Sequence, residues 1–295
     1  MMKNEAMVIH ETGSMKFKRI SSKVLRIAFL ALVLFLLYFP LFVIILLSLD
    51  EDPSGVEFTG ITLKWYQAFF SDEAVMSAVK WTFLTAICAT IISTIFGTLA
   101  AVGINSLNRK AKTRLLMLNN IPILNADVVT AVFLLILFNV LRALLHTQIL
   151  GFGTLLISHV LFSTPYVVLS VLPKLGEMDK NLYDAAIDLG CTPKKALVKV
   201  IIPYVKSGIF SGALLAFTMS IDDFVISSFV MGGSINNFST WLYSSCLKGS
   251  ARSYVWPKAY VYNTIITVTI FIGLIVFNLI SSKKGKTNYV SKKSR

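Results

Sequence analysis

Six long apolar runs constrain this 295-residue chain more than any other feature of its sequence. A helix that crosses a lipid bilayer needs about 20 mostly apolar residues. Runs of this kind cover approximately residues 25–48, 77–106, 126–145, 152–173, 207–231 and 258–280. Because lipid cannot satisfy exposed backbone groups, such runs are expected to be helical. They follow one another too closely to leave room for a soluble domain, so the sequence predicts one all-α, six-span membrane domain.

The composition agrees with a membrane protein. Hydrophobic residues make up 55% of the chain and charged residues only 15%, whereas soluble domains are about a quarter charged. The first run is about 24 residues long and is not followed by a small-x-small cleavage site, so we expect it to remain as an anchor. Cys88, Cys191 and Cys246 are scattered, and their spacing indicates neither a disulfide framework nor a metal site.

The basic charge of the chain is concentrated on alternate loops. Of 28 Lys and Arg residues, 22 lie in residues 1–26, 109–114, 174–206 or 283–295. The positive-inside rule assigns these segments to the cytoplasm. We therefore predict a basic cytoplasmic segment 1–24, a membrane domain 25–282 and a basic cytoplasmic tail 283–295. Basic flanks of membrane spans explain the net charge of +13, so nucleic acid is not expected as a partner.

Three local patterns refine this picture. Ser93, Gly97 and Ala101 recur every four residues, and small residues at this spacing allow close helix packing in lipid. The aromatic residues of ITLKWYQAFF, residues 61–70, predict an amphipathic segment at the membrane interface. Pro122 predicts an interruption in NNIPILN, residues 119–125, because proline disfavours helix at the preceding residue.

A polar, basic loop, LYDAAIDLGCTPKKALVKVIIP, occupies residues 182–203 between the fourth and fifth runs. Residues 180–190 can form a short helix on which Ala186 and Gly190 make a flat patch that another protein could approach closely. After a turn, Pro193 can begin a second short helix, and Pro203 closes the loop. From the pattern alone, a docking surface and a plain surface hairpin both remain open.

Two adjacent carboxylates, Asp222 and Asp223, lie within the fifth run, and Asp127 opens the third. An ionised Asp at the centre of a spanning helix costs about 2.5–3.5 kcal/mol. Such a pair requires a wet cavity, a cation or a proton. Because adjacent helical residues point about 100° apart, one carboxylate could face a pathway while the other anchors a neighbouring helix. Helix pairing or capping of a broken helix explains the pair equally well.

Two motifs resemble those of a known family. The loop resembles the EAA coupling loop of ABC-importer permeases, with Asp184-Ala185-Ala186 in place of Glu-Ala-Ala, then Gly190, then a hydrophobic ending at Pro203. Asp184 keeps the usual charge with one methylene less. The run FTMSIDDFVISSFVMG, residues 217–232, is similar to the fifth span of spermidine/putrescine permeases. The resemblance covers approximately residues 25–282.

The resemblance implies a type I (MetI-like) ABC permease fold in a bacterial inner membrane. It implies that the coupling loop, residues 179–203, inserts into a groove of an ATPase subunit. The expected partners are two ABC ATPase subunits, a second homologous permease, an extracytoplasmic substrate-binding protein and the lipid bilayer. The expected substrate is a polyamine, spermidine or putrescine, with Asp222, Asp223 and Asp127 as candidate pathway residues. The partner ATPase would bind ATP, so neither a cofactor nor a catalytic residue is expected in this chain.

Alternative functions remain open at this point. The fifth-span motif shades into permeases for iron or thiamine. A secondary transporter would more typically show an internal repeat or several charged spans. A membrane enzyme would need a catalytic cluster, but the three histidines are dispersed, and His159 with Asp127 is the only conceivable pair.

Overall fold

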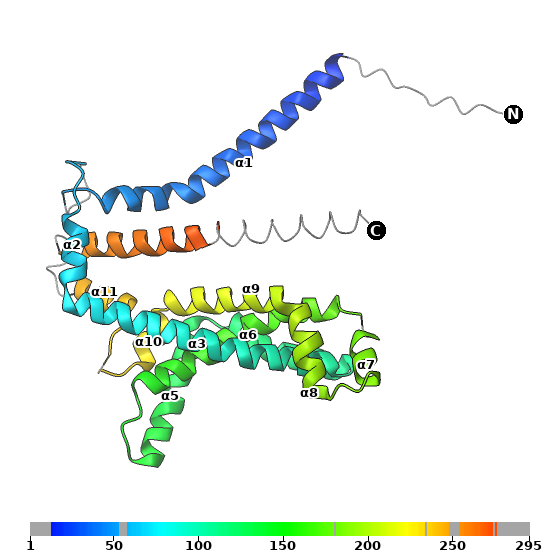
Figure 1. The fold of residues 1–295 in the computed structure, drawn as a ribbon. Helices are drawn as coiled ribbons and strands as arrows, with labels where there is room; N and C mark the ends of the chain where they lie inside the picture. The colour runs from blue at the N-terminus through cyan, green and yellow to red at the C-terminus, as the bar shows by residue number, and fades with distance from the viewer. Residues whose placement is uncertain are drawn as a thin grey trace. The chain divides into compact units, whose positions relative to one another are not determined.

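The computed structural model describes residues 13–52, 58–179, 181–233, 235–247, 254–273 and 275. This part of the chain is helical, and the only strand-type pairing in it is the bridge between Asp50 and Ile61. The helices are α1 Gly13–Leu47, α2 Lys64–Ser71, α3 Glu73–Ser106, α4 Arg109–Leu124, α5 Asp127–Leu145, α6 Phe152–Gly176, α7 Asn181–Asp188, α8 Pro193–Ala196, η1 Leu197–Ile201, α9 Ile202–Ile221, α10 Val225–Val230 and α11 Phe238–Leu247 (Figure 1). A further helix covers residues 254–273.

The chain forms two compact units. One unit, Phe70–Gly249, contains α3 to α11. The other combines Met1–Phe69 with Ser250–Arg295 and contains α1 and the helix over 254–273. The candidate site residues that the sequence singles out all belong to the first of these units.

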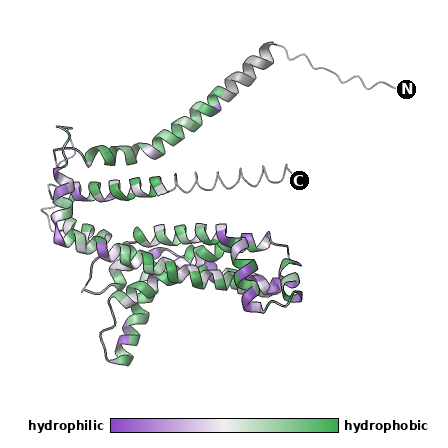
Figure 2. Cartoon of the chain, viewed as in Figure 1, coloured by the Kyte–Doolittle hydropathy of each residue, from purple (hydrophilic) through white to green (hydrophobic). Residues whose placement is uncertain are grey.

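Five helical stretches are long and apolar enough to cross a membrane: Val24–Leu47, Glu73–Ser106, Asp127–Leu145, Phe152–Gly176 and Pro193–Ile221. The first four match the predicted spans closely. Figure 2 shows apolar residues along these helices and hydrophilic residues gathered around α7 and α8. The predicted sixth span begins within the helix over 254–273, and its end lies outside the described residues.

The prediction of the fifth span as residues 207–231 is wrong at both ends. The helix begins at Pro193 and runs without interruption through α8, η1 and α9 to Ile221. It is then broken at residues 222–224, and α10 begins at Val225. Hydropathy does not detect this break, because apolar residues continue on both sides of the two carboxylates.

Pro203 does not close the loop as predicted, because it lies in the first turn of α9. The preceding segment, η1, is a π-helical turn in which the N–H of Ile202 donates to the carbonyl of Leu197. Proline has no N–H to donate to the carbonyl four residues earlier, and its ring clashes with that carbonyl in a regular helix. The wider π turn accommodates Pro203 and lets the helix continue.

The interruption predicted at Pro122 is also displaced. α4 remains helical through Pro122 and ends at Leu124, where the N–H of Asn125 donates to the carbonyl of Ile121. Ala126 is the N-cap residue of α5. The chain therefore breaks at residues 125–126, three to four residues after Pro122.

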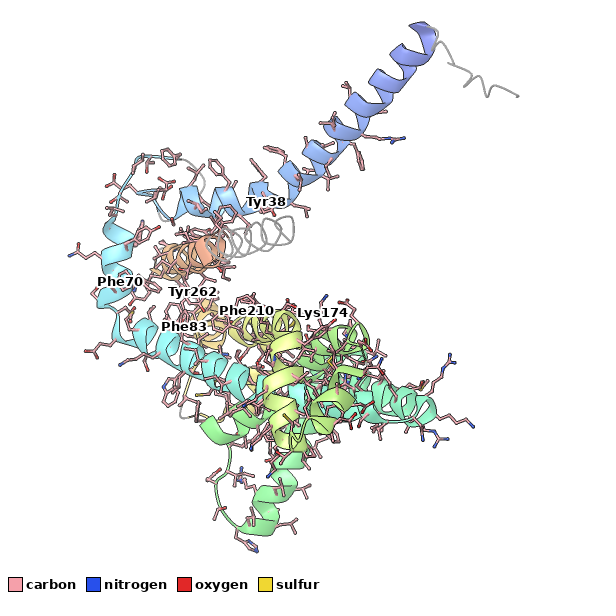
Figure 3. The ribbon with its side chains drawn as sticks, turned by 45° about the vertical axis from the view of Figure 1, so that its right-hand side comes forward. Tyr38, Phe70, Phe83, Lys174, Phe210 and Tyr262 are labelled. Atoms are coloured by element: carbon pink, nitrogen blue, oxygen red, sulfur yellow. The ribbon has the colours of Figure 1, made fainter. Side chains whose placement is uncertain are left out.

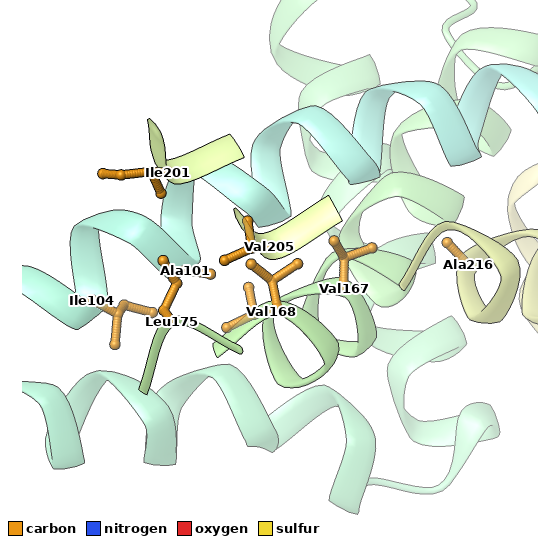
Figure 4. Close-up of a cluster of buried hydrophobic side chains, with 9 residues drawn as sticks. Ala101, Ile104, Val167, Val168, Leu175, Ile201, Val205 and Ala216 are labelled. Atoms are coloured by element: carbon orange, nitrogen blue, oxygen red, sulfur yellow. The ribbon is translucent and has the colours of Figure 1, made fainter. Parts of the chain in front are cut away.

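Helices α3, α6 and α9 pack against one another as the centre of this unit. A core cluster of buried side chains joins them with η1: Ala101, Ile104, Val167, Val168, Val171, Leu175, Ile201, Val205 and Ala216 (Figure 4). The small-residue face of α3 is buried, as predicted. Gly97 allows close approach, since a Cβ atom there would lie 2.7 Å from Cβ of Val167.

Replacing Gly97 with alanine is therefore expected to destabilise the bundle by about 1–3 kcal/mol, the usual cost of overpacking. Gly103→Ala is the matched control, because a Cβ atom there meets nothing within 4 Å. At such an open helical position alanine is expected to be neutral or to stabilise by up to about 1 kcal/mol. Thermal melting of the two purified variants in detergent compares them, and equal melting temperatures would contradict the close packing of α3 on α6.

The other unit has a hydrogen-bonded loop beyond the end of α1. The indole N–H of Trp65 donates to the backbone carbonyl of Asp50 at 2.9 Å, and the Asp50 carboxylate accepts from the amide and hydroxyl of Thr59 at 3.0 and 3.1 Å. Burial raises the pKa of Asp50, but hydrogen bonds from Thr59, Asp52 and Gly60 more than offset this and hold the pKa below its usual range.

This lowered pKa predicts that wild type is more stable than Asp50→Asn at neutral pH. A carboxylate whose pKa is depressed by folding contributes stability above its unfolded pKa and loses it as the pH falls through the folded value. The difference in melting temperature between the two proteins should therefore narrow below about pH 4. A difference that stays constant from pH 7 to pH 3 would show that the Asp50 charge does not stabilise this loop.

Candidate functional site

The loop between α6 and α9 forms a compact helical hairpin. α7 packs against α8 and η1, with Ala186 and Ala196 buried between them. At the end of α6, Lys174 pairs with Glu177 at 2.9 Å, and the hydroxyl of Tyr204 donates to the Glu177 carbonyl at 3.0 Å. Figure 3 labels Lys174 of α6 and Phe210 of α9. The bond from Tyr204 ties the start of α9 to the end of α6, so the two spans meet at the base of the hairpin.

Gly190 ends α7 for a reason of backbone geometry. Its φ is +85°, a conformation that favours glycine. The N–H of Gly190 donates to the Ile187 carbonyl at 2.9 Å and the N–H of Cys191 donates to the Ala186 carbonyl at 3.0 Å. This pair of bonds is a Schellman motif. The sequence predicts that Gly190 belongs to a flat docking patch, and in the structure Gly190 terminates α7.

The outer face of the hairpin leaves apolar and acidic side chains in solvent. Leu189 is 85% exposed and Val198 is 59% exposed. Asp184 and Ala185 are exposed, whereas Ala186 is buried. We call the exposed residues Asp184, Ala185 and Leu189 the α7 face. Five residues are expected to contact an ATPase. Asp184, Ala185 and Gly190 are exposed in the hairpin, Ala186 is buried, and Pro203 lies in α9.

The three candidate pathway carboxylates line one pocket of about 350 Å³. Asp127 comes from the first turn of α5, while Asp222 and Asp223 come from the break between α9 and α10. The remaining lining residues are contributed by α4, α5, α6, α9 and α10: Pro122, Thr130, Phe162, Tyr166, Thr218, Met219, Phe224, Val225 and Ile226. We name it the acidic pocket. Its aromatic lining was not anticipated from the sequence.

Asp223 caps the short helix that follows the break. Its carboxylate accepts hydrogen bonds from the N–H of Ser227 at 2.8 Å, the hydroxyl of Ser227 at 2.7 Å and the N–H of Ile226 at 3.3 Å. The amide of Asn237 donates to the Asp223 backbone carbonyl at 3.0 Å. Of the two explanations that the sequence left open, capping of a broken helix therefore applies to Asp223.

Asp222 and Asp127 differ from Asp223 in their surroundings. Both are exposed. Asp222 is the C-cap residue of α9, and its N–H donates to the Thr218 carbonyl at 3.3 Å. Its carboxylate has no hydrogen bond or ion pair within the described part of the chain. Asp222 can therefore present a charge to the acidic pocket.

His159 contacts Asp223 and not Asp127, the carboxylate that the sequence left as its one conceivable partner in an enzyme. Its Nε2 lies 3.5 Å from a carboxylate oxygen of Asp223 and 3.1 Å from the hydroxyl of Ser227. Its Nδ1 lies 2.6 Å from the hydroxyl of Ser220. A histidine within an apolar span was the signal for this cluster, because intramembrane ionisable residues usually have a specific partner.

A second pocket of about 340 Å³ adjoins the acidic pocket and is mainly apolar. The two pockets share Pro122, Thr130 and Phe162. The other lining residues come from α4, α5 and α6: Ile121, Asn125, Val129, Phe133, Leu134 and Leu161. Carboxylates, aromatic rings and aliphatic side chains therefore border one continuous region.

Comparison with known proteins places these features in a family. The family model described as "Binding-protein-dependent transport system inner membrane component" matches residues 93–284. The spermidine/putrescine transport system permease protein PotC of Escherichia coli strain K12 is 31% identical over 266 residues, which cover 90% of this chain and 97% of PotC. The putrescine transport system permease protein PotI of the same strain is 34% identical over 226 residues, which cover 76% of this chain and 80% of PotI.

The fold also has a solved counterpart. A chain of a bacterial ABC transporter involved in the import of the acidic polysaccharide alginate superposes with a TM-score of 0.66. The match covers 92% of this chain and 98% of that chain, at 15% sequence identity. At this identity the match concerns the fold alone, and it confirms the predicted ABC importer permease fold.

Proposed function

This chain belongs to the family of inner membrane components of binding-protein-dependent transport systems, and we propose that it lines the pathway of an ATP-driven polyamine importer. Members of this family are non-catalytic permease subunits, so the chain itself is assigned no reaction. The names of the relatives in Escherichia coli give spermidine and putrescine as transported compounds. The observation on this chain that carries the proposal is the acidic pocket.

The chemistry of the acidic pocket suits a polyamine. Alkylamines are protonated at neutral pH, since amines of the lysine type have pKa values near 10. A polyamine therefore presents positive charges separated by methylene groups. Asp222 and Asp127 supply negative charge, and the rings of Phe162, Tyr166 and Phe224 supply faces for cation–π contacts. The adjoining apolar pocket can accept methylene groups.

Iron and thiamine remain the alternative substrates. A ferric ion prefers several oxygen ligands held close together, whereas thiamine carries one permanent charge on an aromatic ring. In the described residues no group of three or more His, Cys, Asp or Glu side chains could hold a metal ion. This favours an organic cation over a free metal ion.

The proposed partners follow from the family and from the hairpin. A binding protein would deliver the substrate, a second permease would complete the pathway, and two ATPase subunits would bind ATP. The α7 face would meet the ATPase. Because α8, η1 and α9 form one helix, movement of the hairpin would be carried directly to the break that holds Asp222.

We propose that both termini and the hairpin lie in the cytoplasm of a bacterial cell. In a variant without native cysteines, single cysteines at Thr147 and Asn236 should react with a membrane-impermeant maleimide in intact cells. Cysteines at Thr113 and Lys195 should react only after permeabilisation. All four positions are exposed. Labelling at Lys195 in intact cells would contradict the orientation and the coupling role of the hairpin.

The proposed function is tested by complementation. A strain without its own polyamine importers receives this chain with its cognate permease, ATPases and binding protein. We expect uptake of labelled spermidine or putrescine that excess unlabelled polyamine suppresses and excess thiamine does not. Suppression by thiamine, or uptake no greater than in the strain lacking this chain, would reject the polyamine assignment.

A further inference from the structure

His159 of α6 contacts both sides of the break in the fifth span. Its Nδ1 meets Ser220 in the last turn of α9, and its Nε2 meets Ser227 in α10. His159 is 1% exposed, and both serines are buried. A second bond holds α10 on α6, since the hydroxyl of Thr154 donates to the Val230 carbonyl at 2.8 Å.

The hydroxyl of Ser227 determines which groups donate and which accept in the hydrogen bonds around His159. Ser227 donates its single hydroxyl proton to Asp223, so its oxygen must accept a proton from Nε2 of His159. A neutral imidazole then accepts at Nδ1 from the hydroxyl of Ser220. The bonds form a chain from Ser220 through His159 and Ser227 to Asp223, and it satisfies both ring nitrogens without a charged imidazole.

This series of hydrogen bonds occupies the Asp223 carboxylate with groups of the protein itself. That carboxylate already accepts three hydrogen bonds at the start of α10, and the Asp223 side chain is 9% exposed. Asp222, one residue earlier, is exposed in the acidic pocket. A cation that displaced the bonds of Asp223 would leave buried N–H groups without partners, which is costly.

We propose that His159 is a positioning residue that ties Asp223 into the break, so that Asp222 and Asp127, and not Asp223, meet the transported cation. The assignment of the cation rests on the proposed function. The link between His159 and Asp223 does not, because it can be measured without any substrate. His159 sets where α9 ends relative to α10 and thereby holds Asp222 at the pocket.

The link is tested by a double-mutant cycle on the assembled complex in detergent. His159→Leu removes both hydrogen bonds and is expected to lower the melting temperature by about 4 °C or more. Combined with Asp223→Asn, the loss should be clearly less than the sum of the two single losses, whereas with Asp222→Asn the losses should add. Gln148→Leu, at an exposed position after α5, is the control and should leave melting unchanged. Additive losses for His159→Leu with Asp223→Asn would overturn the proposal.

Positioning is separated from mere stability in proteoliposomes, at a temperature where every variant stays assembled. We expect His159→Leu to lower the amount of polyamine transported per ATP hydrolysed several-fold. His159→Gln, whose amide N–H can replace the Nε2 donor to Ser227, should restore most of that ratio. If His159→Leu transports as much polyamine per ATP hydrolysed as wild type, the positioning role is overturned. Absence of polyamine uptake by the wild-type complex would reject the proposed function and leave the melting cycle to decide on His159.

Discussion

A complex that carries Asp222→Asn is expected to assemble normally and to lose at least about 30-fold in ATP-driven polyamine uptake. Asp222 is exposed in the single subunit, and the proposed second permease would enclose it with the bound cation. Removing one partner of a charge pair that is enclosed in this way costs about 2 kcal/mol or more, which corresponds to this factor. Asparagine keeps the size and hydrogen-bonding capacity of the side chain, so only the charge is lost. Since the Asp222 carboxylate makes no hydrogen bond or ion pair within the described chain, assembly should not depend on it. Uptake by reconstituted complexes, normalised to assembled protein, measures the effect.

Two further variants decide how this result is interpreted. Glu73→Gln neutralises an exposed carboxylate in the first turn of α3, away from the acidic pocket, and should retain uptake. Asp223→Asn should lower the melting temperature and the yield of assembled complex, because it weakens the cap of α10. Normal uptake by Asp222→Asn, or an assembly defect as large as that of Asp223→Asn, would contradict the division of roles between the two neighbours.

Replacing Ala185 with tryptophan is expected to abolish co-purification of the ATPase while the subunit still inserts into the membrane. Ala185 is exposed on the α7 face, so a bulky side chain fits in the isolated subunit and obstructs only a docked partner. Loss of a contact worth about 1.4 kcal/mol already lowers affinity tenfold, and a steric clash in a groove should exceed it. Gly190→Trp would be less informative, because the left-handed backbone at Gly190 would strain any side chain and disturb α7 itself.

Thr113→Trp is the matched control for this experiment. Thr113 is exposed on α4, outside the hairpin, so the same bulk is placed beside another basic loop. The control should retain the ATPase. Retention of the ATPase by a correctly inserted Ala185→Trp subunit would refute docking through the α7 face.

Hydropathy predicts the first four spans, and the spacing of small residues predicts the buried face of α3. The run 77–106 matches α3 closely, and Ser93, Gly97 and Ala101 are buried as their spacing indicates. The end of α7 and the start of α8 also follow from local residues, since Gly190 supplies the left-handed backbone after α7 and Thr192 caps the helix that begins at Pro193.

The break at Asp222–Asp223 could not be located from the sequence, because it depends on contacts between distant segments. Asp222 ends α9, and Asp223 caps α10 only where His159, 64 positions before it, and Asn237 reach the same point. A continuous apolar run conceals such a break. Pro203 shows the opposite error, since a residue that normally stops helices is accommodated by the π turn of η1.

Reconstituted transport tests the central claim most directly. The wild-type complex in proteoliposomes, with ATP inside and the loaded binding protein outside in the proposed orientation, should accumulate labelled spermidine or putrescine. Accumulation should require ATP hydrolysis and should fall to background with Asp222→Asn. ATP-dependent accumulation that is equal in wild type and Asp222→Asn, or the absence of polyamine accumulation by an assembled complex that hydrolyses ATP, would contradict a polyamine pathway through the acidic pocket.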